Sequence, residues 1–113
     1  MRSDRLYLAD ILDAIQAIER FTVGFDESRF TGDELVQSAV LQKLAVIGVA
    51  AARISPATRT LAPELPWREM GGFRNVAVHA YFSIDWRIVW ITVVDDLPKL
   101  RASATEISHR LKS

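Results

Sequence analysis

The spacing of the apolar residues constrains this chain most, because it follows the period of an α-helix almost everywhere. Between about Ser3 and Val23 apolar side chains recur every three or four positions, which places them on one helical face. No segment alternates apolar and polar residues as a half-buried strand does. The stripe consists of Leu8, Ile11, Leu12, Ile15 and Ile18. With 113 residues, the chain has the size of one domain, residues 1–113, and we predict that it is all-α.

A second helix is predicted from the stretch Phe30–Leu35, after a stop at Gly24. Thr31 and Glu34 match a capping box, and the two end residues of the stretch stand where a hydrophobic staple needs them. Residues 46–52 are apolar on every side of this helix. We therefore expect this part to be buried between neighbours, with its glycine and alanines permitting close backbone approach.

The second helix should end at about Ile54, where a loop with three prolines begins. A third helix is expected from about Pro66 to about Tyr81. Its Gly71-Gly72 pair costs roughly 1 kcal/mol per glycine relative to alanine. A kink or tight packing at this pair is the expected reason for the two glycines.

A fourth helix, starting near Asp85, has almost no polar face as far as Val94. Such a helix must be covered on two sides, and the bundle core and a partner subunit are the simplest covers. Pro98 either kinks this helix or begins a final one behind Asp95 or Asp96. Four or five antiparallel helices with mostly short links predict an up-and-down bundle.

The composition excludes several classes of protein. The chain has no cysteine, which rules out disulfide scaffolds, cysteine zinc sites and thiol catalysis, and fits a reducing cytoplasm. Lys+Arg and Asp+Glu are both 14, so any contact with RNA must come from a local basic patch. The longest apolar run, Leu44–Ala52, is too short to span a bilayer, and no signal-type apolar core follows the first residues. We expect a cytoplasmic protein without a membrane partner.

One group of residues carries recognisable chemistry: Arg74, His79 and Tyr81. An imidazole can take a proton from a ribose 2′-hydroxyl near neutral pH, and a guanidinium can hold a phosphate and stabilise charge developing on it. Five helical residues rotate by roughly 140°, so Arg74 and His79 do not share a face of a straight helix. Either the helix is distorted or the two groups meet those of a second subunit. The alternative is structural: a core histidine, a surface arginine and a core aromatic.

The sequence indicates no other site. His109 lies in the basic tail Ser108–Lys112, where we expect it to be solvated. His79 has no second histidine or carboxylate at helical ligand spacing, so no metal site is predicted. There is no phosphate-binding glycine loop and no nucleophile elbow, and we expect no cofactor.

The stretch from Pro66 to Pro98 resembles the HepT-like branch of the HEPN superfamily. Arg74, His79 and Tyr81 match its Arg-x4-His-x-Tyr signature, and the flanking residues match its PWRE lead-in and its AYF…D…IVW…DLP pattern. The opening of the chain, RLYL followed by DIL, is similar too. The resemblance therefore covers nearly the whole chain.

The resemblance implies a HEPN-type helical bundle that dimerises and forms a ribonuclease site between the two motifs. By it, Arg74 and His79 are the catalytic pair, Tyr81 belongs to the site, and Asn75 is the polar residue often found after the arginine. It also implies the toxin of a type II/VII-like toxin–antitoxin pair. The implied antitoxin is a minimal nucleotidyltransferase that adenylylates Tyr81. One departure is Val49, where the family commonly has the glutamate of Ile-Gly-Glu-Ala.

Three functions are open at this point. The first is an endoribonuclease toxin, which the complete Arg, His and Tyr motif favours. The second is a catalytically weak helical module that serves as partner or substrate of a nucleotidyltransferase, which Val49 favours. The third is a plain dimeric interaction protein, and only the neutral net charge supports it.

Overall fold

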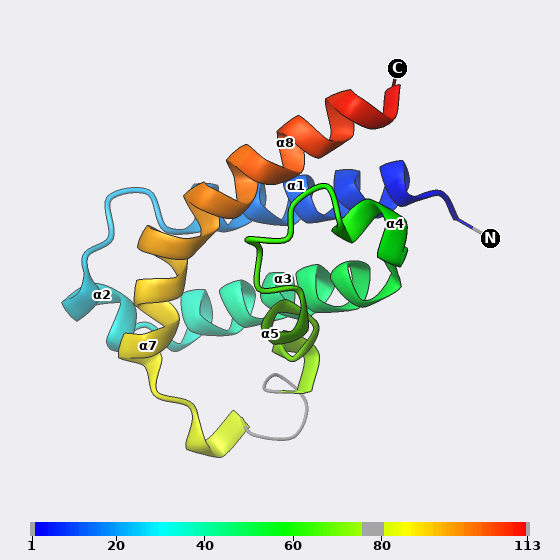
Figure 1. The fold of residues 1–113 in the computed structure, drawn as a ribbon. Coiled ribbons are helices and arrows are strands. Elements are labelled where there is room, and N and C mark those ends of the chain that lie inside the picture. Colours follow the sequence, from blue (N-terminus) through cyan, green and yellow to red (C-terminus); the bar gives the residue numbers. More distant parts are fainter. Residues whose placement is uncertain (1, 76–80, 113) are drawn as a thin grey trace.

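The computed structural model describes residues 2–75 and 81–112, apart from the side chains of Tyr81 and Lys112. In this part of the chain every regular element is helical and there is no strand, which confirms the all-α prediction (Figure 1). The elements are α1 (Asp4–Phe21), α2 (Glu27–Thr31), α3 (Glu34–Arg53), α4 (Pro56–Arg59), α5 (Trp67–Gly71), the 3₁₀ turn η1 (Tyr81–Ser83), α7 (Trp86–Ile91), the π-helical turn η2 (Thr92–Asp96) and α8 (Leu97–Lys112).

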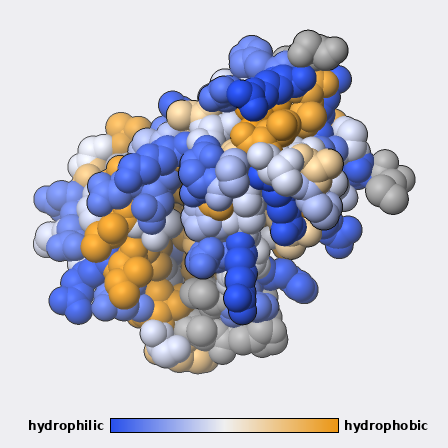
Figure 2. Space-filling model, viewed as in Figure 1, coloured by the Kyte–Doolittle hydropathy of each residue, from blue (hydrophilic) through white to orange (hydrophobic). Residues whose placement is uncertain are grey.

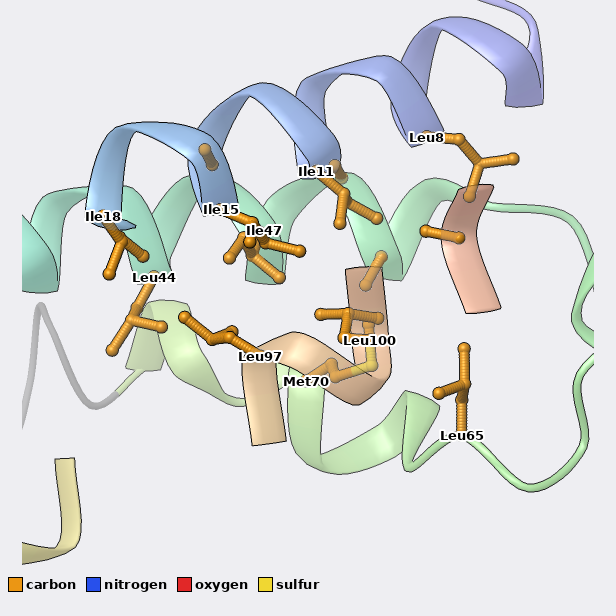
Figure 3. Packing of buried hydrophobic residues seen from close by; sticks show 14 of the residues in the cluster. Leu8, Ile11, Ile15, Ile18, Leu44, Ile47, Leu65, Met70, Leu97 and Leu100 are labelled. Carbon is orange, nitrogen blue, oxygen red and sulfur yellow. The ribbon is translucent and has the colours of Figure 1, made fainter. Parts of the chain in front are cut away.

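The core forms where α1, α3, α5 and α8 meet. The α1 and α3 helices lie side by side, and α8 packs along α1 (Figure 1). The predicted stripe of α1 points into this core and, apart from the partly buried Leu12, is fully buried (Figure 3). It meets Leu44 and Ile47 of α3, Met70 of α5, and Leu97 and Leu100 of α8.

The predicted start of the second long helix was wrong, because the short helix α2 precedes it and contains Thr31. Thr31 is the last residue of the short helix α2, and the N-cap of α3 is Asp33, whose Oδ1 accepts a hydrogen bond from the Val36 N–H at 3.0 Å. Leu35 is 81% exposed, so it forms no hydrophobic staple with Phe30, which is buried. Asp33 caps the helix because it directly precedes the first helical residue, from where its carboxylate reaches the free N–H three residues on, whereas Thr31 is the last residue of α2.

By length and composition alone, α3 is apolar enough to cross a membrane. The sequence-based expectation considered only the shorter apolar run Leu44–Ala52 and therefore predicted no helix that could cross a membrane. One side of α3 nevertheless packs against α1 and α5 in the bundle, which is the position of a core helix.

The proline loop after α3 contains a short helix, α4, that the sequence pattern did not predict. Ser55 caps α4, and the Asp4 carboxylate ties this cap to the start of α1. Asp4 accepts hydrogen bonds from the Ser55 N–H at 3.2 Å and from the Ser55 and Thr58 hydroxyls, both at 2.5 Å. Arg59 donates to the carbonyls of Ile54, Ala51 and Ala52, each at 3.1 Å, so the C-terminus of α3 is capped by a side chain.

The last two helices form one continuous rod, so Pro98 kinks a helix and does not start a new one behind an aspartate cap. The π-helical turn η2 lies immediately before Pro98, and the Leu97 N–H bonds to the Thr92 carbonyl. A proline in a regular α-helix clashes with the carbonyl four residues earlier and leaves it without a donor. Widening the preceding turn relieves that clash without ending the helix.

Candidate functional site

The described part of the motif begins where α5 ends against α3. Gly72 is the C-cap of α5, and residues 73–75 form a further helical turn. The helix is therefore interrupted at the glycine pair Gly71-Gly72. A Cβ on Gly48 of α3 would lie 2.9 Å from the Arg74 nitrogen and 2.9 Å from the Met70 carbonyl oxygen. It would also lie 3.3 Å from the Phe73 Cβ. Only glycine admits so close an approach, and the backbone of Arg74 is therefore seated on α3.

Arg74 and Asn75 are both exposed, so the guanidinium is available to a ligand while its backbone is packed. His79 lies outside the described residues, and so does the remainder of 76–80. The backbone of Tyr81 begins the turn η1, but its side chain is not among those described. The structure thus places Arg74 and Asn75 of the predicted site, and the meeting of Arg74, His79 and Tyr81 stays a prediction.

Val49, which replaces the glutamate of the resembling family, sits next to the glycine that seats Arg74. The prediction that residues 46–52 are enclosed on every side was wrong here. Val49 is 38% exposed, and Ala52 is exposed as well. Val49 lines a hollow of about 340 Å³ between α1 and α3. Two arginines, Arg2 and Arg53, line the same hollow.

A second hollow of about 410 Å³ lies between α5 and the η2–α8 rod. Phe73 and Met70 contribute to its apolar wall. Three carboxylates stand at its edge and one lysine accompanies them, namely Glu64, Glu69, Asp96 and Lys99. An RNA backbone is repelled by this edge, because the carboxylates outnumber the cation.

The fourth predicted helix is covered on one side only. Val89 and Val93 are buried, whereas Ile88 is 62% exposed and both Ile91 and Val94 are exposed too. Figure 2 shows apolar surface over α7 and η2. We refer to Ile88, Ile91 and Val94 as the α7 apolar strip. Its exposure agrees with the sequence-based view that this helix has two apolar sides.

The remaining predictions on the site concern His109 and metal ligands. His109 is exposed on α8, as the solvated interpretation of the basic tail requires. Within residues 2–75 and 81–112, no three His, Asp or Glu side chains gather into a group that could hold a metal ion.

The protein is thus an all-helical bundle. Its motif arginine, Arg74, has its backbone packed against Gly48 and its side chain exposed, just after the end of α5. Residues 11–107 match the model of the Ribonuclease HepT-like family, and the chain belongs to this family of ribonucleases. A probable ribonuclease HepT of Thermococcus cleftensis is 43% identical over 100 residues, covering 88% of this chain and 91% of the relative. A putative RNase of Methanocaldococcus jannaschii is 35% identical over 100 residues, covering 88% and 92%. A putative RNase of Caldanaerobacter subterraneus is 29% identical over 112 residues, covering 99% and 100%. No solved structure matches the chain significantly.

Proposed function

We propose that this ribonuclease is an endoribonuclease that cleaves RNA without a metal ion, using Arg74 and His79. The observation that carries the proposal is the placement of Arg74, whose backbone is packed on Gly48 while its side chain is exposed. A fixed backbone limits the positions of the guanidinium, and such preorganisation is what transition-state stabilisation needs.

The proposed reaction is a transesterification within the RNA. His79 takes the proton of the ribose 2′-hydroxyl, the 2′-oxygen bonds to phosphorus, and the bond from phosphorus to the 5′-oxygen breaks. The leaving oxygen takes a proton from solvent. Arg74 binds the phosphate and stabilises the charge that develops on it. The products are a 2′,3′-cyclic phosphate, or the 3′-phosphate after its hydrolysis, and a 5′-hydroxyl.

Cleavage assays on purified protein test this mechanism. Arg74→Ala and His79→Ala should each lower the cleavage rate about 100-fold or more. Arg68→Ala is the matched control, because Arg68 is also exposed and lies on the preceding helix. Cleavage that stops on chelation and returns with magnesium would contradict the metal-independent route.

We further propose that the protein acts as a homodimer that pairs through the α7 apolar strip. Exposed apolar side chains that recur on one side of a helix favour a covered surface over a solvated one. A second subunit also answers the spacing problem of the motif, because Arg74 of one chain could then act with His79 of the other.

The biological role that we propose is that of a toxin in the cytoplasm, neutralised by a minimal nucleotidyltransferase. AMP on Tyr81 would add bulk and negative charge to the proposed site and so repel an RNA backbone. Co-expression with such a nucleotidyltransferase followed by intact-mass measurement tests this role. An unmodified mass, or an AMP adduct that persists in Tyr81→Phe, would show that Tyr81 is not the acceptor.

A second candidate function is a catalytically weak module that chiefly serves as partner or substrate of the nucleotidyltransferase. Val49 favours it, because a glutamate at this position could orient the motif arginine. RNA cleavage by the purified protein separates the two candidates, since only the endoribonuclease loses a measurable rate in Arg74→Ala.

A further inference from the structure

The hollow between α1 and α3 lies on the same helix, α3, against which the backbone of Arg74 packs. Its floor is apolar and consists of Val46, Val49 and Ala50 of α3. Val49 follows Gly48 directly in the chain, and Gly48 is the residue on which Arg74 is packed. Ligand pockets of roughly 300 Å³ or more are large enough for a small ligand, and about 340 Å³ suits a single nucleotide.

One wall of the hollow is an arginine held in place by two contacts. Nη1 of Arg2 donates to Oδ2 of Asp10 at 2.5 Å, and the guanidinium lies 5.0 Å from the centre of the Tyr7 ring. The two contacts fix the position of the guanidinium, while 47% of the Arg2 side chain remains exposed. Nucleic-acid bases stack on guanidinium planes, so a held arginine is a suitable platform for a base.

The facing wall carries a cation without a counter-charge. Arg53 is exposed, and among the residues that the structure describes no carboxylate pairs with it. A glutamate at position 49 would lie four residues before Arg53, the spacing at which Glu and Arg form an ion pair on a helix. Because this chain has Val49, the guanidinium of Arg53 stays available to an anion.

The two walls are held together by hydrogen bonds between the start of α1 and the residues that follow α3. Asp4 bonds to Ser55 and Thr58, so the start of α1 is fastened to the end of α3. The arginines at these two ends therefore approach one another across the hollow.

We propose that this hollow binds one nucleotide of single-stranded RNA that flanks the cleaved bond, with its base on Arg2 and its phosphate on Arg53. The inference rests on the proposed function, since it extends the RNA path from Arg74. The apolar floor accepts the base, and the net positive charge of Arg2, Asp10 and Arg53 attracts the backbone. The hollow between α5 and the η2–α8 rod has the opposite charge balance, which favours the hollow between α1 and α3 as the place for the strand.

The test measures binding separately from cleavage, with a fluorescent single-stranded RNA made resistant to cleavage by 2′-O-methyl groups. Arg53→Glu should weaken binding about 10-fold and reduce the slope of log K against log salt by about 0.7, the value for one phosphate contact to a single strand. Arg2→Ala should weaken binding by a similar factor, about 10-fold, through lost stacking. Val49→Glu should mimic Arg53→Glu in part, because the new carboxylate pairs with Arg53.

Arg20→Glu is the matched control, since Arg20 is exposed at the far end of α1 and its substitution changes the net charge equally. On cleavable RNA, Arg53→Glu should raise KM and leave kcat nearly unchanged. Circular dichroism of each variant confirms that the helices are retained.

The outcomes for the hollow and for the ribonuclease are distinguishable. If the wild type cleaves RNA but Arg53→Glu binds as well as Arg20→Glu, the nucleotide subsite is wrong and the ribonuclease stands. If the wild type binds RNA through Arg53 without cleaving it, the subsite stands and the proposed reaction is wrong. A wild type that does not bind RNA overturns both, and a Val49→Glu variant with higher affinity overturns the subsite.

Discussion

Gly48 offers a direct test of how the motif arginine is positioned, through the substitution Gly48→Ala. The new Cβ would lie 2.9 Å from two backbone atoms, the Arg74 nitrogen and the Met70 carbonyl oxygen. Ordinary contact begins near 3.4 Å, so the segment that carries Arg74 must move by about 0.5 Å. Neither contact can be relieved by a side-chain rotation, because both atoms belong to the backbone.

The expected cost in stability is moderate. Overpacking of this kind costs about 1–3 kcal/mol, whereas replacing a mid-helix glycine by alanine gains about 1 kcal/mol in helix propensity. The net loss is therefore about 0–2 kcal/mol, which lowers Tm by up to ~8 °C at about 4 °C per kcal/mol. The expected cost in activity is larger, about 10- to 100-fold in the cleavage rate, because small displacements of a catalytic group strongly reduce its effect.

The assay compares Gly48→Ala with Gly71→Ala by thermal unfolding and by RNA cleavage well below both melting temperatures. Among the residues that the structure describes, a Cβ on Gly71 would meet only the Ala52 Cβ, at 3.8 Å, so this variant should keep both stability and activity. A Gly48→Ala protein with wild-type Tm and wild-type cleavage would refute the argument that the close approach of α3 positions Arg74.

Three further predictions follow from other contacts. Asp4→Asn should lose about 1–2 kcal/mol near neutral pH, because it weakens the bonds to the hydroxyls of the α4 cap. Burial raises the pKa of Asp4, but the hydrogen bonds from Ser55 and Thr58 outweigh it and leave that pKa below its ordinary value. The contribution of Asp4 is therefore complete above about pH 4, the unfolded pKa, and is lost as the pH falls through the lower folded pKa, so acid unfolding curves of the two proteins should converge. Arg59→Ala should lower the free energy of unfolding by about 2 kcal/mol, measured by chemical denaturation, because it removes the side chain that caps three carbonyls at the end of α3. The control Arg68→Ala should keep the wild-type midpoint, and a wild-type midpoint in Arg59→Ala would contradict the cap. Ile91→Asp should convert dimers into monomers in sedimentation and abolish RNA cleavage. The control Ala102→Asp, at an exposed position of α8, should do neither. A fully active Ile91→Asp monomer would contradict the composite site.

Local patterns in the sequence were sufficient for the elements whose signal is periodic. The stripe of α1 predicted its buried face, because residues three and four apart necessarily share a side of a helix. Gly24 was predicted as a stop and adopts a φ of 78°, a conformation that glycine adopts readily. A kink or tight packing was predicted at Gly71-Gly72, and α5 ends at this pair.

The sequence also pointed to Arg74, His79 and Tyr81, because the chemistry of these residue types and their spacing can be read without coordinates. Its choice of Thr31 as the cap of the second long helix was wrong, because Thr31 belongs to the separate short helix α2 and Asp33 caps α3.

Only the tertiary structure decided what lies against the motif. The sequence predicted a close backbone approach at the glycine of α3, Gly48, but it could not identify the approaching segment, residues 70–74, which lies more than 20 residues away in the chain. The exposure of Val49 and the presence of Arg2 and Arg53 around one hollow likewise depend on how α1 and α3 pack. The amino-acid sequence by itself thus determined that the chain is helical, which face of α1 is buried and which residue types the motif offers. Packing decided which groups are seated, which are exposed and which face one another, because these properties belong to pairs of distant segments.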